Sequence, residues 1–279
     1  MNEAQTAFVL LYCIYMIIAS FTANTFLAQP LRLLTTFVHE FSHAAACWIT
    51  GGYVHQIEVF PDGGGVTRYR GGCRCIVASA GFLGEALWGM TFVVMSGGRR
   101  TATVASGILI AALLVSLCYS PNRTMVILAV LYSVFTFICI WVEWYVYTPL
   151  LHFVILYFGV FMSFIAITDI YGHTVIRATP GSDAYALYED YGRCCLPRCV
   201  GFTWLLTAIL FQVAAFVLDY MLLSEECEHR GWFECIFDTR VDFRDWQWEG
   251  WDWDQWLELL WYFIKYLCLS TLSDFHHGY

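Results

Sequence analysis

Long apolar runs recur along this chain of 279 residues, and they constrain its fold more than any other feature. About seven of them approach the roughly 20 residues that a helix needs to cross a bilayer. They cover residues 8–28, 31–50, 76–95, 103–118, 125–142, 149–170 and 201–223. The composition agrees, because 59% of the residues are hydrophobic and 13% are charged, whereas soluble domains have about 25% charged residues. We therefore expect a polytopic α-helical membrane protein with about seven transmembrane helices.

The composition also divides the chain into two parts. Residues 1–223 hold the apolar runs, and residues 224–279 form an acidic tail rich in tryptophan. Within the tail, residues 259–272 are apolar but short, which is consistent with an interfacial helix or an eighth span. Cys194 and Cys195 lie close to the last long run, where palmitoylation is possible chemistry. The net charge of −9 and the lack of a basic stripe argue against a nucleic-acid partner. The apolar runs indicate that the surroundings are a lipid bilayer.

The segment "GGYVHQIEVFPDGGGVTRYRGG", residues 51–72, differs from the runs on either side of it. Glycine pairs bound it, and residues 53–60 and 66–69 are rich in β-branched and aromatic side chains. Between these two stretches, Gly63 to Gly65 supply a turn that tolerates positive φ. The pattern predicts a β-hairpin inserted among the membrane helices.

The run 31–50 contains three ionisable residues in the pattern H-E-x-x-H: His39, Glu40 and His43. On a helix, positions i and i+4 share one face, so both imidazoles can bind a single metal ion. Glu40 is adjacent and can take a proton from the attacking water. Ionisable residues in such an apolar segment are candidates for function. The pattern predicts a zinc site with His39 and His43 as ligands and Glu40 as the catalytic acid/base.

A catalytic zinc ion usually has a third protein ligand. Asp169, near the end of the run 149–170, is the first candidate, since it lies inside an apolar helix that runs parallel to the one with the motif. Residue counting leaves a gap of roughly 15–20 Å in depth between His39 and Asp169. Asp183 is the alternative, and His173 is a third option.

Residues 8–223 resemble the M50B-like membrane metallopeptidases, which are related to the site-2 proteases. The resemblance rests on an ordered set of segments: "HEFSHA" (39–44), "GGGVTRYRGG" (63–72), "SAGFLGEALWG" (79–89), "DIYGHTVIR" (169–177) and "SDA" (182–184). It implies an integral-membrane zinc protease with His39 and His43 as ligands and Glu40 as acid/base. It also implies a hairpin that guides an extended substrate by strand addition.

Three features depart from the pattern of that family. Site-2 proteases usually offer the third ligand in an Asp-Gly pair of a later helix, but the only such pair here is Asp62-Gly63, which is expected to form the hairpin turn. Glu85 replaces a small residue and places a carboxylate in the third span. His173 stands where relatives often have an acid.

The leading functional hypothesis is zinc-dependent hydrolysis of peptide bonds in membrane-anchored substrates. The alternative is a catalytically weak or inactive protein of the same fold that acts as a binding partner. A transporter is less well supported, because broken helices and internal repeats are typical of transporters and no such repeat is evident in the sequence. Glu40 beside both histidines favours the enzyme, since a metal-binding protein without catalytic activity has no need of it.

Overall fold

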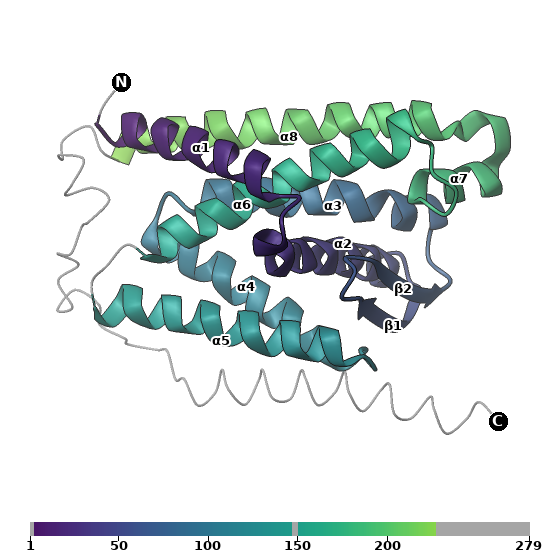
Figure 1. The fold of residues 1–279 in the computed structure, drawn as a ribbon, viewed down its shortest axis with the longest axis horizontal. Helices are drawn as coiled ribbons and strands as arrows, with labels where there is room; N and C mark the ends of the chain where they lie inside the picture. Colours follow the sequence, from purple (N-terminus) through teal and green to yellow (C-terminus); the bar gives the residue numbers. More distant parts are fainter. Residues whose placement is uncertain (1–2, 147–149, 227–279) are drawn as a thin grey trace.

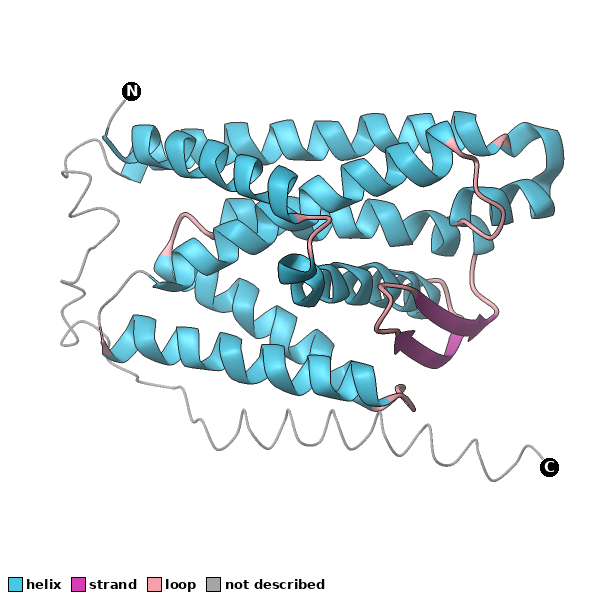
Figure 2. Ribbon diagram, in the orientation of Figure 1, coloured by secondary structure: helices cyan, strands magenta, loops and turns pink. Residues whose placement is uncertain are grey.

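The computed structural model describes residues 3–146 and 150–226, and the predicted features of residues 227–279 lie outside this part of the chain. The described elements are predominantly helical (Figures 1 and 2). In chain order they are α1 (Glu3–Thr22), η1 (Phe26–Ala28), α2 (Gln29–Ile49), β1 (Tyr53–Val59), β2 (Gly65–Arg70), α3 (Arg74–Met95), α4 (Arg99–Leu117), α5 (Arg123–Tyr145), α6 (Leu150–Asp169), η2 (Ile170–Ile176), α7 (Asp183–Tyr191), η3 (Gly192–Cys195) and α8 (Pro197–Glu226). The prediction of a helical membrane protein with a hairpin after the motif helix is confirmed.

Six of the described helices are long and apolar enough to cross a membrane, so this is a multi-pass membrane protein. They are α1, α3, α4, α5, the continuous helix α6–η2, and α8. The remaining expected span, residues 31–50, forms as helix α2, but it is not among the six, because its polar and ionisable residues lower its mean hydropathy. The first helix also ends earlier than predicted, and Pro30 belongs to the first turn of α2, where a proline costs no helical hydrogen bond.

Helix α2 is inclined to its neighbours. Its coils are foreshortened in Figure 1, whereas α3, α5 and α8 run across the view. Residues such as Leu34, Phe37 and Val38 on α2 are fully buried. The motif helix is therefore enclosed by the bundle.

Helix α3 is the central element of the bundle, since it packs against α2, α6 and α8. Glycines allow its close approach to α6: a Cβ on Gly159 would lie 2.7 Å from the backbone nitrogen of Val93. Small residues at such crossings are typical of membrane helices. The packing brings one face of α3 directly against the motif face of α2.

The predicted hairpin is present as two antiparallel strands, with Tyr53 opposite Arg70 and Val59 opposite Gly65. Gly63 adopts the positive φ of +91° that the turn requires. The outer edge of β1 is partly closed by the α4–α5 loop, because Ile57 donates its backbone N–H to the carbonyl of Tyr119 at 3.0 Å. Strand β2 contacts α2.

After α6 the chain continues as a π-helical segment, η2, and then reverses. Ala178 has a φ of +46° and Gly181 a φ of +86°, so the backbone leaves the helical conformation here. Ser182 then caps α7 by accepting a hydrogen bond from the backbone N–H of Tyr185. The short helix α7 packs against α3 and α8, at the end of the bundle where the hairpin also lies (Figure 1).

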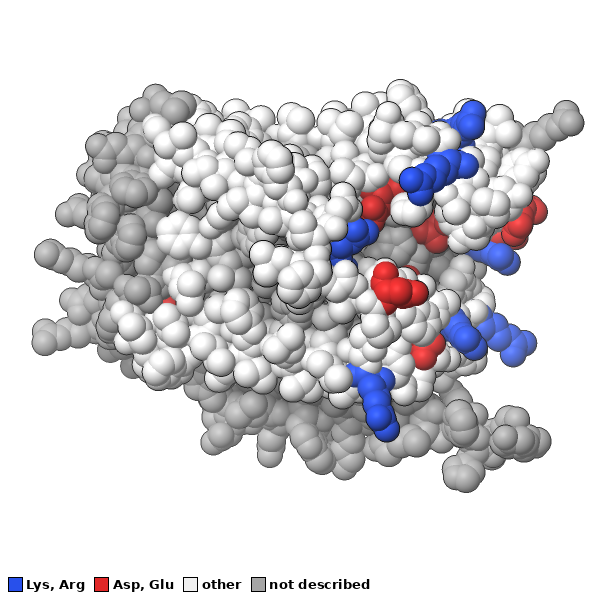
Figure 3. Space-filling view, in the orientation of Figure 1, with Lys and Arg blue, Asp and Glu red and all other residues white. Residues whose placement is uncertain are grey.

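The surface fits a membrane environment. Large apolar side chains are exposed along α5, including Ile127, Leu131, Phe135, Phe137 and Ile138. In Figure 3 the charged residues on the visible face gather at the end that carries the hairpin and α7. The charged end and the apolar belt are consistent with a bundle whose functional residues lie near one membrane surface.

Candidate metal centre

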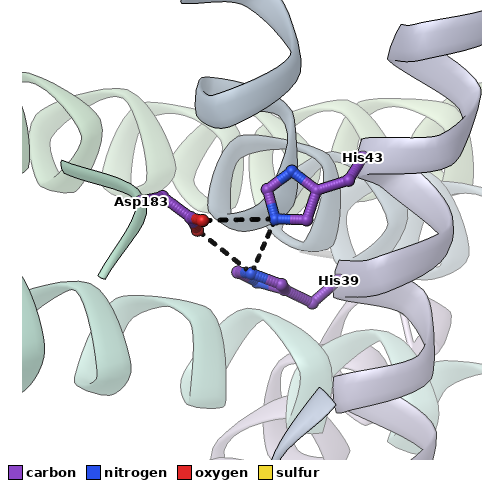
Figure 4. Close-up of side chains that lie close together, drawn as sticks. All are labelled: His39, His43 and Asp183. Carbon is purple, nitrogen blue, oxygen red and sulfur yellow. Dashed lines mark hydrogen bonds and ion pairs between the residues drawn. The ribbon is translucent and has the colours of Figure 1, made fainter. Parts of the chain in front are cut away.

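The two histidines of the motif point to a common position. His39 and His43 lie one turn apart on α2, and their Nε2 atoms are 3.1 Å apart (Figure 4). Both side chains are largely buried, with exposed fractions of 15% for His39 and 9% for His43. The helical spacing thus brings together the two nitrogen ligands that the sequence predicted.

Asp183 faces both histidines from the first residue of α7. Its Oδ2 lies 3.2 Å from His39 Nε2, and its Oδ1 lies 3.4 Å from His43 Nε2. Ligand atoms of the three side chains all lie within 4.8 Å of one another. Among the residues that the structure describes, these three form the group that could hold a metal ion.

Asp169, the first candidate for a third ligand, is not part of this group. It lines a cavity of about 300 Å³ together with Arg32, His173 and Arg177. His39, His43 and Asp183 do not line this cavity. Asp183, the alternative candidate, lies against the histidines instead, because the chain turns back after η2 and α7 begins beside α2.

Glu40 is buried, with 6% of its surface exposed, and the hairpin contacts it. The hydroxyl of Thr67 on β2 lies 2.7 Å from Glu40 Oε2 and 2.9 Å from the carbonyl oxygen of Glu40. Gly65 makes room for the same side chain, since a Cβ there would come within 2.6 Å of Glu40 Oε1. Thr67 is not among the residues predicted to form the site, although it lies in the glycine-rich segment that carries the family resemblance.

Helix α3 packs against the two imidazole rings and orients His43. His43 uses its Nδ1 in a hydrogen bond of 2.6 Å to the carbonyl oxygen of Val77, which leaves Nε2 free to face the site. Gly81, one turn further along α3, lies against both rings, and a Cβ there would be 2.5 Å from Nε2 of His39 and of His43. A glycine at this position therefore keeps the site open.

The carboxylate of Asp183 is in its ionised form near neutral pH. Burial acts to raise its pKa, but the charge of His43 and hydrogen bonds with His39 and His43 hold the pKa below its usual range. Ser182, Asp183 and the capped first turn of α7 also suit a negative charge, since a helix N-terminus favours anions. The site thus places an anionic oxygen opposite two imidazole nitrogens, which bind a metal ion in their neutral form.

Comparisons with curated proteins and with solved structures find no match. Residues 12–218 match the Peptidase M50B-like family, and this range includes the motif helix, the hairpin and Asp183. The match covers more than half of the chain, so the protein belongs to the Peptidase M50B-like family.

Proposed function

We propose that this protein is a zinc-dependent peptidase that cleaves membrane-anchored substrates. The observation that carries the proposal is the convergence of His39, His43 and Asp183 beside a buried Glu40. Membership of the M50B-like family supports peptidase chemistry, and the six apolar helices support a reaction in or beside the membrane.

The three side chains fit zinc. A tetrahedral ion with bonds of about 2.0–2.1 Å holds neighbouring ligand atoms roughly 3.3 Å apart. The Nε2 atoms of His39 and His43 are 3.1 Å apart, and each lies near a different oxygen of Asp183, His39 at 3.2 Å from Oδ2 and His43 at 3.4 Å from Oδ1. Two histidines and one carboxylate form a donor set typical of catalytic zinc sites, and three protein ligands leave a position open for the reacting groups.

Glu40 is the group we assign to proton transfer. When bound, zinc would act as a Lewis acid that polarises the scissile carbonyl and makes water easier to deprotonate. Glu40 would accept the proton of the attacking water and then donate it to the leaving amine. Thr67 holds the Glu40 carboxylate through Oε2, so that its other oxygen is available for this task.

Strand β2 is the element we assign to substrate binding. Within the described residues, no backbone hydrogen bond from another element reaches its outer edge, whereas the edge of β1 is partly closed by Tyr119. An extended peptide could pair with this free edge by strand addition. Because Gly65 and Thr67 contact Glu40, a peptide on this edge would lie close to the acid/base.

The test compares cells that express the wild-type protein with cells that express Glu40→Gln. This substitution keeps the shape of the side chain and removes the proton acceptor. We expect the wild type alone to generate new N-termini within or beside the spans of membrane proteins, as measured by mass spectrometry of isolated membranes. Glu40→Gln should instead co-purify with the uncleaved substrates.

The opposite result would be identical N-termini in both samples, with zinc bound to both proteins. The proposed catalysis would then be contradicted, and the alternative of a non-catalytic binding partner with the same fold would account for the site. Partners captured equally by both proteins would support that alternative.

A further inference from the structure

A second buried acid lies next to the metal centre and has no role in the function proposed above. Glu85 on α3 is 3% exposed, and its Oε2 lies 3.7 Å from Nδ1 of His39. Its Oε1 has no hydrogen-bond partner in the described part of the chain. A buried carboxylate with an unsatisfied oxygen costs stability unless something compensates for it.

Glu85 lies near His39 in the way that the carbonyl of Val77 lies near His43. Val77, Gly81 and Glu85 are spaced four residues apart, so they lie along one face of α3. The carbonyl of Val77 accepts a hydrogen bond from His43 Nδ1, and Gly81 lies against both Nε2 atoms. Glu85 comes next along this face and is close to the Nδ1 atom of the other histidine.

A basic partner does not account for the burial of Glu85. No lysine or arginine among the described residues forms an ion pair with it, and its one ion-pair contact is with His39. Arg32 donates hydrogen bonds to the carbonyl of Ala23 and to Oδ1 of Asn24. The carboxylate therefore does not serve as one half of a structural ion pair with a basic residue.

We propose that Glu85 is a positioning residue for His39, an inference that rests on the proposed metal site. Glu85 accepts a hydrogen bond from Nδ1–H of His39 when the metal is bound, at the distance of about 2.7–2.9 Å that is usual for charge-assisted bonds. This contact fixes the tautomer in which Nε2 carries the lone pair, and it makes that nitrogen a stronger ligand. The two histidines would thus be oriented by two different acceptors on one helix face, a carbonyl for His43 and a carboxylate for His39.

The test measures zinc affinity and stability separately in the full-length protein in detergent. Glu85→Gln keeps the size of the side chain and removes its charge. We expect the zinc affinity, measured by competition with a chelator of known affinity, to fall by about 10–100-fold. The unfolding temperature of the metal-free protein should stay the same or rise, since an incompletely paired buried charge is lost.

A matched control is Glu143→Gln, because Glu143 is also a buried acid of the bundle, with 4% of its surface exposed. It accepts a hydrogen bond from the backbone N–H of Leu151 and lies 3.4 Å from His152 Nε2. Glu143 lies beside the start of α6, whereas α7, which carries Asp183, follows the end of that helix. The control residue is therefore separated from the metal site by the length of α6. We expect the control to lower the unfolding temperature and to leave the zinc affinity unchanged.

Two outcomes would overturn the inference. Equal zinc affinity of the wild type and Glu85→Gln would show that His39 needs no help from this carboxylate. A joint loss of affinity and of stability in the metal-free protein would indicate a structural role instead. Absence of zinc binding by a folded wild type would overturn the proposed function itself, so the two failures are distinguishable.

Discussion

The hydroxyl of Thr67 lies 2.7 Å from Oε2 of Glu40 and thereby joins the hairpin to the motif helix at the proposed acid/base. The same hydroxyl lies 2.9 Å from the carbonyl oxygen of Glu40. Gly65, two residues earlier on β2, leaves space for the Glu40 side chain. The register of the hairpin therefore bears directly on the position of the proposed acid/base.

Replacement of Thr67 by valine tests this link. Valine has nearly the same shape but no hydroxyl, so the buried Glu40 carboxylate loses a hydrogen-bond donor. The expected cost is about 1–3 kcal/mol of unfolding free energy, which thermal unfolding in detergent would measure. Thr67→Ser keeps the hydroxyl and should restore most of the stability. Equal stability of the valine and wild-type proteins would show that the contact contributes little.

Gly81 should be intolerant of any side chain. A Cβ at this position would lie 2.5 Å from Nε2 of both His39 and His43. We expect Gly81→Ala to displace the imidazoles and to lower the zinc affinity by at least about tenfold, since such sites need accurately placed ligands. Chelator competition would measure the change.

Gly107→Ala is the matched control for this prediction, because a Cβ at that position of α4 meets no atom within 4 Å. Alanine favours a helix over glycine by about 1 kcal/mol, so this variant should be as stable as the wild type or more stable. Its zinc affinity should not change. If both alanine variants bound zinc like the wild type, the close contact at Gly81 would not matter for the site.

Glu143 offers a prediction about stability alone. Its side chain joins the end of α5 to the start of α6 through Leu151 and His152, and it also lies 3.9 Å from Arg99 Nε. Truncation of one member of a buried charged network typically costs about 3–5 kcal/mol. We expect Glu143→Ala to lower the unfolding free energy by this amount while zinc content is retained. Full stability of the variant would contradict this account of the network.

Much of the fold could be predicted from the length of the apolar runs and from the glycines. The helices formed near their predicted ranges, because a run of about 20 apolar residues has few alternatives in a bilayer. The hairpin followed from its bounding glycines and the turn at Gly63. The motif helix was harder to classify, since Arg32, His39 and Glu40 lower its hydropathy while the bundle still encloses it.

The third member of the candidate metal centre could not be chosen from the sequence alone. Residue counting along a straight helix places Asp169 far from His39 in depth. Such counting does not predict the path of the chain after the helix ends. The π-helical segment, the positive φ of Ala178 and Gly181, and the cap at Ser182 together return the chain so that Asp183 meets the histidines. The contacts of Thr67 and Glu85 likewise depend on how α2 packs against the hairpin and α3.

The central claim is that His39, His43 and Asp183 hold one zinc ion, and the most direct measurement is the metal content of the purified full-length protein by mass spectrometry. The wild type should contain about one zinc ion per chain. Asp183→Asn should lose most of it, whereas Asp169→Asn should keep it, because Asp169 lies outside the group. Zinc that persists in Asp183→Asn and is lost in Asp169→Asn would contradict the account.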